Sequence, residues 1–496
     1  MKRRHLLQSS IAAAFAASLP TPALLAAISE VRATIDAVTG DGKQVTLSQS
    51  AVKELSDSLR GQLLLPGQEG YDVARQVLNP VINKHPALVV RPSGPADIMN
   101  AVSFARERNL LVAVKCGGHS FSGKSTCEGG MQIDLSSFRS ARVDPESRTA
   151  YIAGGSLLGE LDHETMAHGL VTTAGTVSHT GVGGLTLGGG FGRLARRYGL
   201  ALDNVSGVDI VTADGKLVHA SAEEHPDLFW AVRGGGGNFG VVTSFEFKLH
   251  PMSRTVIGGD VVFPLKDLPG VLGFYADQVA SAPDDLYLDF VVNSDLNKED
   301  GVCILHACYS GPADKAEKIL APIQKAGTPV HDGIKAIDYV AIQSAWDNTD
   351  PRNTGSYLKS GFVNEIPDQL VSTIVQNYKA FNERGTTMFF QHSGGAIGRV
   401  PADATAFAHR KSIANMFAVV AWPLTESRDS HVSYIKEYWK DFEPFTDGWY
   451  TNEVDDHAAG TVNRNYQGNI ERLVNVKNRY DPSNLFRLNA NVKPTV

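Results

Sequence analysis

Two long glycine-rich runs constrain the fold more than any other feature of this chain. The first spans residues 114–123 and reads Val-Lys-Cys-Gly-Gly-His-Ser-Phe-Ser-Gly. The second spans residues 174–192 and is richer still in glycine. Because glycine has no side chain, the backbone N–H groups of such loops can close around an anion such as a pyrophosphate. Two loops of this kind, with His119 inside the first, predict a nucleotide cofactor that the backbone holds and one side chain fixes.

The two runs resemble the flavin-binding loops of the vanillyl-alcohol-oxidase superfamily, and within it the berberine-bridge-enzyme-like branch. The resemblance extends from about Leu63 to the C-terminus and includes residues 225–234, 240–243 and 479–489. In that branch the histidine of Gly-Gly-His is bonded to the 8α-methyl carbon of FAD, which implies a covalent bond at His119.

Many relatives attach the flavin a second time, through the cysteine of a Gly-Thr-Cys sequence at the start of the second loop. This chain has Gly175, Thr176 and Val177 at those positions. Since valine cannot form a thioether, the expectation is FAD held covalently through His119 only.

The expected fold class is α+β. The resemblance implies a PCMH-type FAD-binding domain in two parts, together with an α+β substrate domain that contains an antiparallel sheet. A strand–helix–strand order over residues 87–114 fits the first part, and long strand-like runs from about residue 256 onward fit the second. The expected divisions are a signal peptide (1–27), a lead-in (28–60), the FAD-binding domain (61–255), the substrate-binding domain (256–454) and a return segment of the FAD domain (455–496).

The N-terminus has the composition of a targeting segment. Residues 2–7 read Lys-Arg-Arg-His-Leu-Leu and precede an apolar, alanine-rich stretch from residue 11 to about residue 27. The paired arginines resemble a twin-arginine signal, although Lys2 stands where such signals usually have serine or threonine. An ordinary secretory signal or a retained anchor is the alternative. No other apolar run approaches the roughly 20 residues that span a bilayer, so the mature chain is expected in the bacterial periplasm without a transmembrane anchor.

The amino-acid composition limits the classes of partner that the chain can bind and the disulfides that it can form. The formal net charge of −7 leaves no excess of lysine and arginine to neutralise phosphates, which argues against a nucleic-acid partner. Four cysteines are too few for a disulfide scaffold. A Cys116–Cys127 bridge stays open as an alternative to free thiols, whereas Cys303 and Cys308 are expected to point to opposite faces of one strand. The oligomeric state is not indicated.

Two further patterns do not support the sites that they resemble. Residues 235–240 satisfy the dinucleotide pattern G-x-G-x-x-G, but an expected helix precedes them and an expected strand follows, which is the reverse of the required order. His163 and His168 resemble a zincin pair, but at i and i+5 their imidazoles do not share a helix face. No metal site is predicted.

The candidate base lies near the C-terminus. Tyr450, Thr451, Asn452 and Glu453 resemble the Tyr-x-Asn-Tyr element beside the flavin, in which the second tyrosine of many relatives deprotonates the substrate. Here that position is Glu453, and a carboxylate in a dry site can have its pKa raised enough to act as a base. Tyr450 sharing the proton, and a merely structural Glu453, stay open as alternatives.

Two other positions bear on the chemistry. Gln391 and His392 alternate along an expected strand over the flavin, so only one of them can face the cofactor, and His392 is the expected catalytic one. Thr180 matches the position that gates oxygen in relatives, and its small size favours O2 as acceptor.

The residues expected to bind FAD lie in the two loops and in two matching later segments. They are His119 (covalent), Cys116, Gly117, Gly118, Ser120, Gly123, Gly175, Thr176, Thr180, Gly181, Gly184, Leu185, Gly189, Gly190, Gly240, Val242, Asn489 and Asn491. The resemblance therefore implies an exported FAD-dependent oxidoreductase that oxidises a small alcohol, sugar or amine by hydride transfer. The alternatives are a periplasmic dehydrogenase with another acceptor and a flavoprotein that has lost catalysis.

Overall fold

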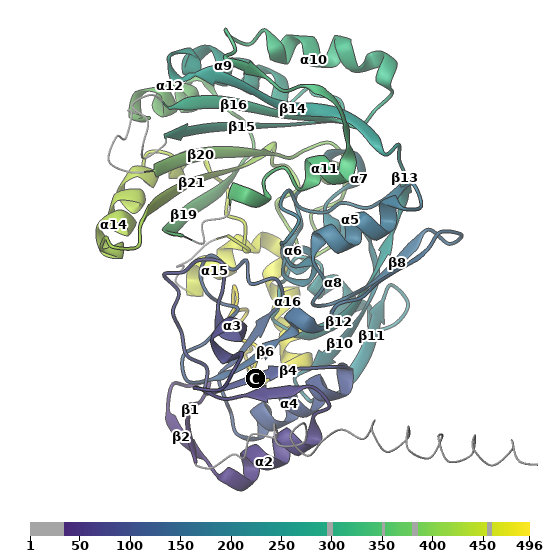
Figure 1. Cartoon of the computed structure of the whole chain (residues 1–496), viewed down its shortest axis with the longest axis vertical. Coiled ribbons are helices and arrows are strands. Elements are labelled where there is room, and N and C mark those ends of the chain that lie inside the picture. Colours follow the sequence, from purple (N-terminus) through teal and green to yellow (C-terminus); the bar gives the residue numbers. More distant parts are fainter. Residues whose placement is uncertain (1–33, 295–300, 350–352, 379–384, 454–458) are drawn as a thin grey trace, which may run out of the picture.

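The computed structural model describes residues 34–294, 301–349, 353–378, 385–453 and 459–496. The expected signal peptide (1–27) lies outside these residues. The fold has two main parts: a lower part with the N-terminal elements and the C-terminus, and an upper part built on one large sheet (Figure 1).

The lower part begins with a small, mostly parallel sheet. Its helix α4 (Pro95–Glu107) starts at a proline, which suits the first helical turn, and buries Ile98, Ala101, Val102 and Ala105 at helical spacing. The helix connects two parallel strands that both pair with the strand between them. The strand order is β3 (Gln62–Leu64), β4 (Leu88–Arg91), β6 (Met131–Asp134) and β5 (Val112–Lys115).

A second, antiparallel sheet completes the lower part. Its five strands run in the order β11 (Leu217–Ser221), β10 (Val205–Thr212), β12 (Gly240–Lys248), β8 (Thr149–Ala153) and β7 (Ala141–Asp144). Helix α8 (Pro226–Val232) precedes β12, with the glycines of residues 234–237 between them. The reversed order expected around the G-x-G-x-x-G pattern is therefore confirmed, and a Rossmann site is excluded there.

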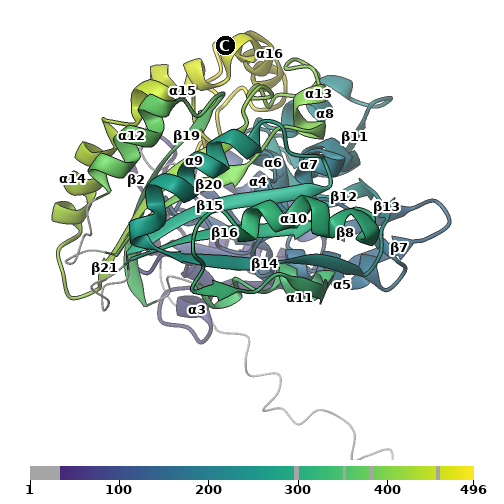
Figure 2. The same cartoon turned by 90° about the horizontal axis from the view of Figure 1, so that it is seen from above.

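The upper part is a large antiparallel sheet covered by helices on its outer face (Figures 1 and 2). Alternate side chains enter a core that these helices share, among them Phe290, Leu305, Met388 and Phe390. The remaining face is turned toward the glycine loops. The main strands, in spatial order, are β14 (Thr255–Pro264), β16 (Val302–Tyr309), β15 (Leu286–Ser294), β20 (Gly385–His392), β21 (Ala414–Pro423) and β19 (Thr354–Val363). The covering helices include α9 (Leu268–Val279), α10 (Ala316–Gln324), α12 (Asp368–Asn377) and α14 (Arg428–Trp439).

The end of the chain returns to the lower part. Helix α16 (Ile470–Tyr480) packs against α8, and its buried Lys477 forms a 2.7 Å ion pair with Asp481. The Lys477 ammonium also donates to the carbonyls of Asn238 and Phe486. This network ties residues near the C-terminus to the loop before β12.

All four cysteines are free thiols. Cys303 and Cys308 belong to different core clusters on the two faces of β16, as expected from their odd spacing.

Candidate active site

One cavity of about 840 Å³ lies between the glycine loops and the inner face of the large sheet. Cofactor sites commonly occupy about 300–1,000 Å³, so the volume suits a large ligand. Both glycine-rich runs contribute to its wall, together with residues 450–453 and the chain near Asn489. The cavity therefore joins segments that are far apart in the sequence.

The two glycine loops touch backbone to backbone. The first loop leaves β5, and the second leads into the short helix α6 (Val182–Gly188). A Cβ on Gly117 would collide with the backbone nitrogen of Gly181, and a Cβ on Gly181 would collide with Cys116. Only glycine fits at these two positions, so the close approach explains the motif in physical terms.

His119 faces the second loop from the first. Its Nε2 lies 2.7 Å from Nδ1 of His179, and its Nδ1 lies 3.3 Å from Oγ1 of Thr180. All three side chains line the cavity, as does Val177. The histidine expected to hold the cofactor thus stands in the cavity, and His179 stands beside it.

Tyr450 and Glu453 lie on another part of the same wall. The Tyr450 hydroxyl accepts hydrogen bonds from the Gly190 amide (2.9 Å) and from the side chain of Asn452 (2.9 Å). Burial holds the pKa of Tyr450 well above its ordinary value, so the phenol keeps its proton. With its oxygen already accepting twice, this hydroxyl is suited to donate a hydrogen bond.

Glu453, unlike Tyr450, can exchange its proton near neutral pH. Burial raises the pKa of its carboxyl to about 7, and a 3.0 Å hydrogen bond from the Asn415 side chain offsets only part of that effect. A carboxyl with this pKa exchanges a proton near neutral pH, which is the property of a general base or acid.

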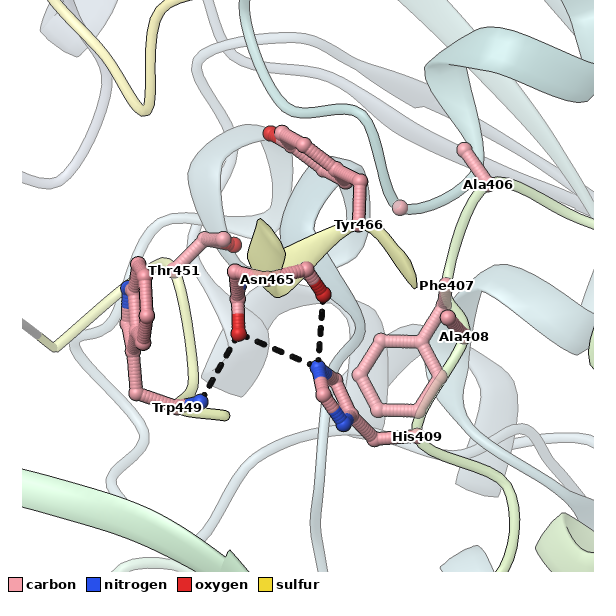
Figure 3. A pocket seen from close by; sticks show the side chains of 9 residues that line it. Ala406, Phe407, Ala408, His409, Trp449, Thr451, Asn465 and Tyr466 are labelled. Atoms are coloured by element: carbon pink, nitrogen blue, oxygen red, sulfur yellow. Dashed lines mark hydrogen bonds between the residues drawn. The ribbon is translucent and has the colours of Figure 1, made fainter. Parts of the chain in front are cut away.

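A buried network supports the segment that carries Tyr450. Figure 3 shows Asn465 accepting from the backbone N–H of Trp449 (2.8 Å) and from Nε2 of His409 (3.1 Å). The His409 ring also stacks on Phe362, with 4.6 Å between ring centroids. Asn452 adds a bond to the carbonyl of Leu185, which fastens this segment to the second glycine loop.

The expected role of His392 is wrong. Gln391 lines the cavity, while His392 lies fully buried on the opposite face of β20. Its Nδ1 accepts from the Leu288 amide (3.0 Å) and its Nε2 donates to the Val279 carbonyl (2.9 Å) at the end of α9. Both ring nitrogens are engaged in structural bonds, and burial holds the pKa of His392 well below its ordinary value.

Several other expected cofactor residues lie behind the cavity wall. Gly123, Gly189, Gly190 and Asn491 do not line it, although Gly190 holds the Tyr450 hydroxyl. The remaining expected residues do line it, namely Cys116, Gly117, Gly118, His119, Ser120, Gly175, Thr176, Thr180, Gly181, Gly184, Leu185, Gly240, Val242 and Asn489.

Sequence reasoning missed the wall formed by the large sheet. The strands contribute Asp260, Asn293, Phe389 and Phe417, and Trp346 joins them from the turn at residues 344–346. Phe389 stacks on Phe417 at 4.6 Å, and Trp346 meets Phe389 edge-on at 5.8 Å. Strand alternation could have grouped the four strand side chains, but only if the buried face of each strand had been known.

Asp260 is the charged member of this wall. His306 donates from Nδ1 to Asp260 at 2.5 Å, and its Nε2 accepts from Arg193 at 3.0 Å. Burial lowers the pKa of His306 to about 4, so the ring is neutral and its two nitrogens have fixed roles. Burial tends to raise the pKa of Asp260, but the His306 hydrogen bond prevails and the carboxylate stays ionised.

The volume and the lining of the cavity fit FAD. It has the required volume, a wall of close-packed glycine backbone and a long apolar sheet wall that could cover a ring system. The side chains of His119, Ser120 and Thr176 offer polar contacts along the loops.

Comparison with known proteins agrees with this geometry. Residues 86–221 match the family described as "FAD binding domain", and residues 449–493 match "Berberine and berberine like". An FAD-linked oxidoreductase of Dictyostelium discoideum is 33% identical over 450 residues, which cover 89% of this chain and 97% of that protein. The chain belongs to the berberine-bridge-like family of FAD-linked oxidoreductases.

Other relatives of this FAD-linked oxidoreductase have named activities. The (R)-6-hydroxynicotine oxidase of Paenarthrobacter nicotinovorans is 29% identical over 88% of this chain and 97% of that protein. The crystal structure of 6-hydroxy-D-nicotine oxidase from Arthrobacter nicotinovorans superimposes with a TM-score of 0.81, covering 88% of this chain and 98% of that one at 27% identity. The expected α+β, PCMH-type fold is confirmed by this agreement.

Two features are absent from the part of the oxidoreductase that the structure describes. Within the described residues, none of the helices has the length and apolar character needed to cross a membrane. The same residues contain no group of three or more histidine, cysteine, aspartate or glutamate side chains that could hold a metal ion.

Proposed function

We propose that this FAD-linked oxidoreductase is an exported oxidase of a small alcohol, sugar or amine, with FAD bonded to His119 and O2 as acceptor. The observation that carries the proposal is that His119 and Glu453 line one cavity. When bound, FAD supplies the hydride acceptor for a substrate carbon that bears an O–H or N–H group. The residues of the chain bind and orient the substrate and take its proton.

The covalent bond is proposed at His119 alone. Val177, at the position matched to the attaching cysteine of relatives, cannot form a thioether. Forming the single bond replaces one hydrogen of the 8α-methyl group and one imidazole hydrogen. Both hydrogens and both electrons leave with O2 as hydrogen peroxide. Mass spectrometry of the His119 peptide should find the flavin mass after acid precipitation, and free FAD in the supernatant of wild type would contradict the bond.

Glu453 is proposed as the base that takes the substrate proton. Its pKa of about 7 allows it to be ionised in the resting site and protonated after the reaction. Tyr450 is proposed as a donor to the substrate, because its raised pKa opposes proton loss and its oxygen already accepts two hydrogen bonds. Gln391 then contacts the substrate from the sheet wall, in place of His392.

Oxygen as acceptor is supported by the small side chain of Thr180 at the cavity wall. In relatives, valine or a smaller residue at the matching position accompanies oxidases, and leucine accompanies dehydrogenases. Stopped-flow mixing of the reduced enzyme with air-saturated buffer tests this assignment. Reoxidation within seconds supports an oxidase, whereas persistence of the reduced flavin supports the dehydrogenase alternative.

The substrate is proposed only by class. Named relatives include (R)-6-hydroxynicotine oxidase and a xylooligosaccharide oxidase, so the family accommodates both a hydroxynicotine and xylooligosaccharides. Anaerobic bleaching of the flavin by a panel of alcohols, sugars and cyclic amines tests the class directly. Failure of the whole panel would favour a flavoprotein without catalysis.

Export is proposed through the twin-arginine route, which carries folded proteins and so suits an enzyme that acquires FAD before export. The support is the Arg3-Arg4 pair followed by an apolar stretch. Replacement of both arginines by lysine should trap the precursor in the cytoplasm. Unchanged export of that double variant would indicate the ordinary secretory path.

A further inference from the structure

The His119–His179 contact joins the two glycine loops through their side chains. Nε2 of His119 lies 2.7 Å from Nδ1 of His179, a distance at which one nitrogen must donate and the other accept. The rings are tilted by 40° with centroids 4.8 Å apart, so the contact is a hydrogen bond between ring edges and not a stack. The direction of this bond decides which nitrogen of His119 carries the lone pair.

The far side of His179 fixes that direction. Its Nε2 lies 3.2 Å from the backbone carbonyl oxygen of Asp347. Because a carbonyl can only accept, Nε2 of His179 carries the hydrogen, and in the neutral ring Nδ1 then carries a lone pair. His119 must therefore donate from Nε2, and its own Nδ1 carries the lone pair. The Thr180 hydroxyl, at 3.3 Å, can donate to that lone pair and orient the ring.

Asp347 is held firmly in the position that His179 needs. Its carboxylate accepts a 2.7 Å bond from the Ser178 amide and a short bond from the Ser178 hydroxyl. Ser178 precedes His179 in the second glycine loop, whereas Asp347 comes from the chain that follows α11 (Tyr339–Gln343) in the upper part. The carboxylate of Asp347 thus holds Ser178, and its carbonyl accepts from the His179 ring.

We propose that His179 is the base that accepts the His119 proton when the flavin bond forms at His119. The inference rests on the covalent attachment proposed above. The new bond joins Nδ1 of His119 to the 8α-methyl carbon, which loses one hydrogen. The Nε2 hydrogen of His119 passes to Nδ1 of His179. The two electrons go to O2, which collects both hydrogens and leaves as hydrogen peroxide, so that His179 returns to its neutral form.

The physical need for such a base is clear from the charge. An imidazole that forms a third bond at Nδ1 becomes a cation unless its Nε2 hydrogen leaves. Transfer of that hydrogen as a proton to a neighbouring base avoids the cation. His179 is placed on the hydrogen that must leave, at hydrogen-bond distance.

Two substitutions at His179 distinguish a residue that accepts a proton from one that only accepts a hydrogen bond. In His179→Asn the amide oxygen can stand near the place of Nδ1 and accept a hydrogen bond, but it cannot take a proton. In His179→Ala both properties are lost. The full-length chain is produced in a riboflavin-starved host and mixed with FAD in air, and acid-precipitable flavin is followed with time. We expect attachment in both variants to be about 100-fold slower than in wild type, the size typical of a lost general base.

Two controls sharpen the result. His163→Ala removes an exposed histidine outside the cavity and keeps the base, so attachment should proceed at the wild-type rate. Added imidazole should restore attachment in His179→Ala, because it can fill the vacated space and accept the proton. Binding of FAD before attachment, measured by flavin fluorescence, should be similar in all variants.

The outcomes distinguish this inference from the proposed function. Wild-type rates in His179→Asn, or failure of imidazole to rescue His179→Ala, would overturn the role of His179 while leaving attachment at His119 intact. If wild type itself releases all its FAD on denaturation, the covalent attachment is wrong and the inference falls with it. Slow attachment in both variants with rescue by imidazole would establish the base.

Discussion

The two walls of the cavity are built in different ways. The glycine-loop wall, drawn from residues 116–122 and 175–185, is rich in glycine, and its glycines pack so closely that a Cβ has no room at Gly117 or Gly181. The sheet wall presents alternate side chains from separate strands, such as Asp260, Phe389 and Gln391. The first wall is fixed by main-chain geometry, and the second can change its chemistry one side chain at a time.

This difference assigns the roles of the two walls. A surface of backbone N–H groups suits the part of the ligand that stays constant, which in this family is FAD. A surface of exchangeable side chains on a rigid sheet suits the part that varies between relatives, which is the substrate. Changes on the loop wall should therefore abolish cofactor binding, whereas changes on the sheet wall should alter substrate selection.

The largest effect is expected on the loop wall. Gly117→Val places a branched side chain against the backbone of Gly181, so the loops must separate and FAD should be lost completely. The measurement is the ratio of flavin to protein absorbance in the purified variant. Gly273→Ala in α9 is the matched control, because a Cβ there meets nothing within 4 Å and should leave the ratio unchanged. A normal flavin content in Gly117→Val would contradict the claim that close backbone packing on the loop wall is needed to bind FAD.

The adjacent pair Gln391 and His392 provides the next test, because the two side chains leave the same strand in opposite directions. Gln391→Ala should raise KM with little change in thermal stability. His392→Ala should leave KM near the wild-type value but lower the free energy of unfolding by about 2–5 kcal/mol, since it leaves a buried N–H and a buried carbonyl unpaired. Steady-state kinetics and denaturant titration of both variants test this. A raised KM in His392→Ala, together with an unchanged KM in Gln391→Ala, would indicate that His392 contacts the substrate.

Much of the fold follows from local sequence signals. The strands at residues 88–91 and 131–134, and the helix that starts at Pro95, agree with patterns of apolar spacing and a helix-starting proline. The glycine loops were recognisable because a backbone cradle needs glycine at particular places. These features depend on interactions within a few residues, which the sequence displays directly.

The face of each strand was not predictable in the same way. Alternation shows that Gln391 and His392 point to opposite faces, but the helices that cover one face come from distant segments such as α9. The choice of His392 rested on its chemistry alone. The Val279 carbonyl that accepts a hydrogen bond from its ring lies 113 residues away in the sequence. The contact between His179 and Asp347 was not predictable for a similar reason, because Asp347 approaches from the other part of the molecule.

The smallest expected effect is on the pH dependence of the unfolding free energy, through Asp289 on β15. Burial raises the pKa of Asp289 to about 7 from an ordinary value near 3.8, so the folded state holds a proton that the unfolded chain releases. The resulting stability is fully present below about pH 4 and is lost as pH rises through about 7. Asp289→Asn removes this titration and should make the unfolding free energy fall less between pH 5 and pH 8. Parallel pH profiles of wild type and variant would contradict the assignment.

The central claim is that Glu453, and not Tyr450, takes the substrate proton. Anaerobic stopped-flow measurement of flavin reduction against pH, using a substrate found by the bleaching panel, tests it most directly. In wild type the rate should rise with pH through about 7 and then level off, because the base acts in its ionised form. Glu453→Gln should be about 100-fold slower and lose this dependence, while Tyr450→Phe should be slower but keep it. A Glu453→Gln variant with near wild-type rates, beside a Tyr450→Phe variant that reduces no flavin, would contradict the account and make the tyrosine the base.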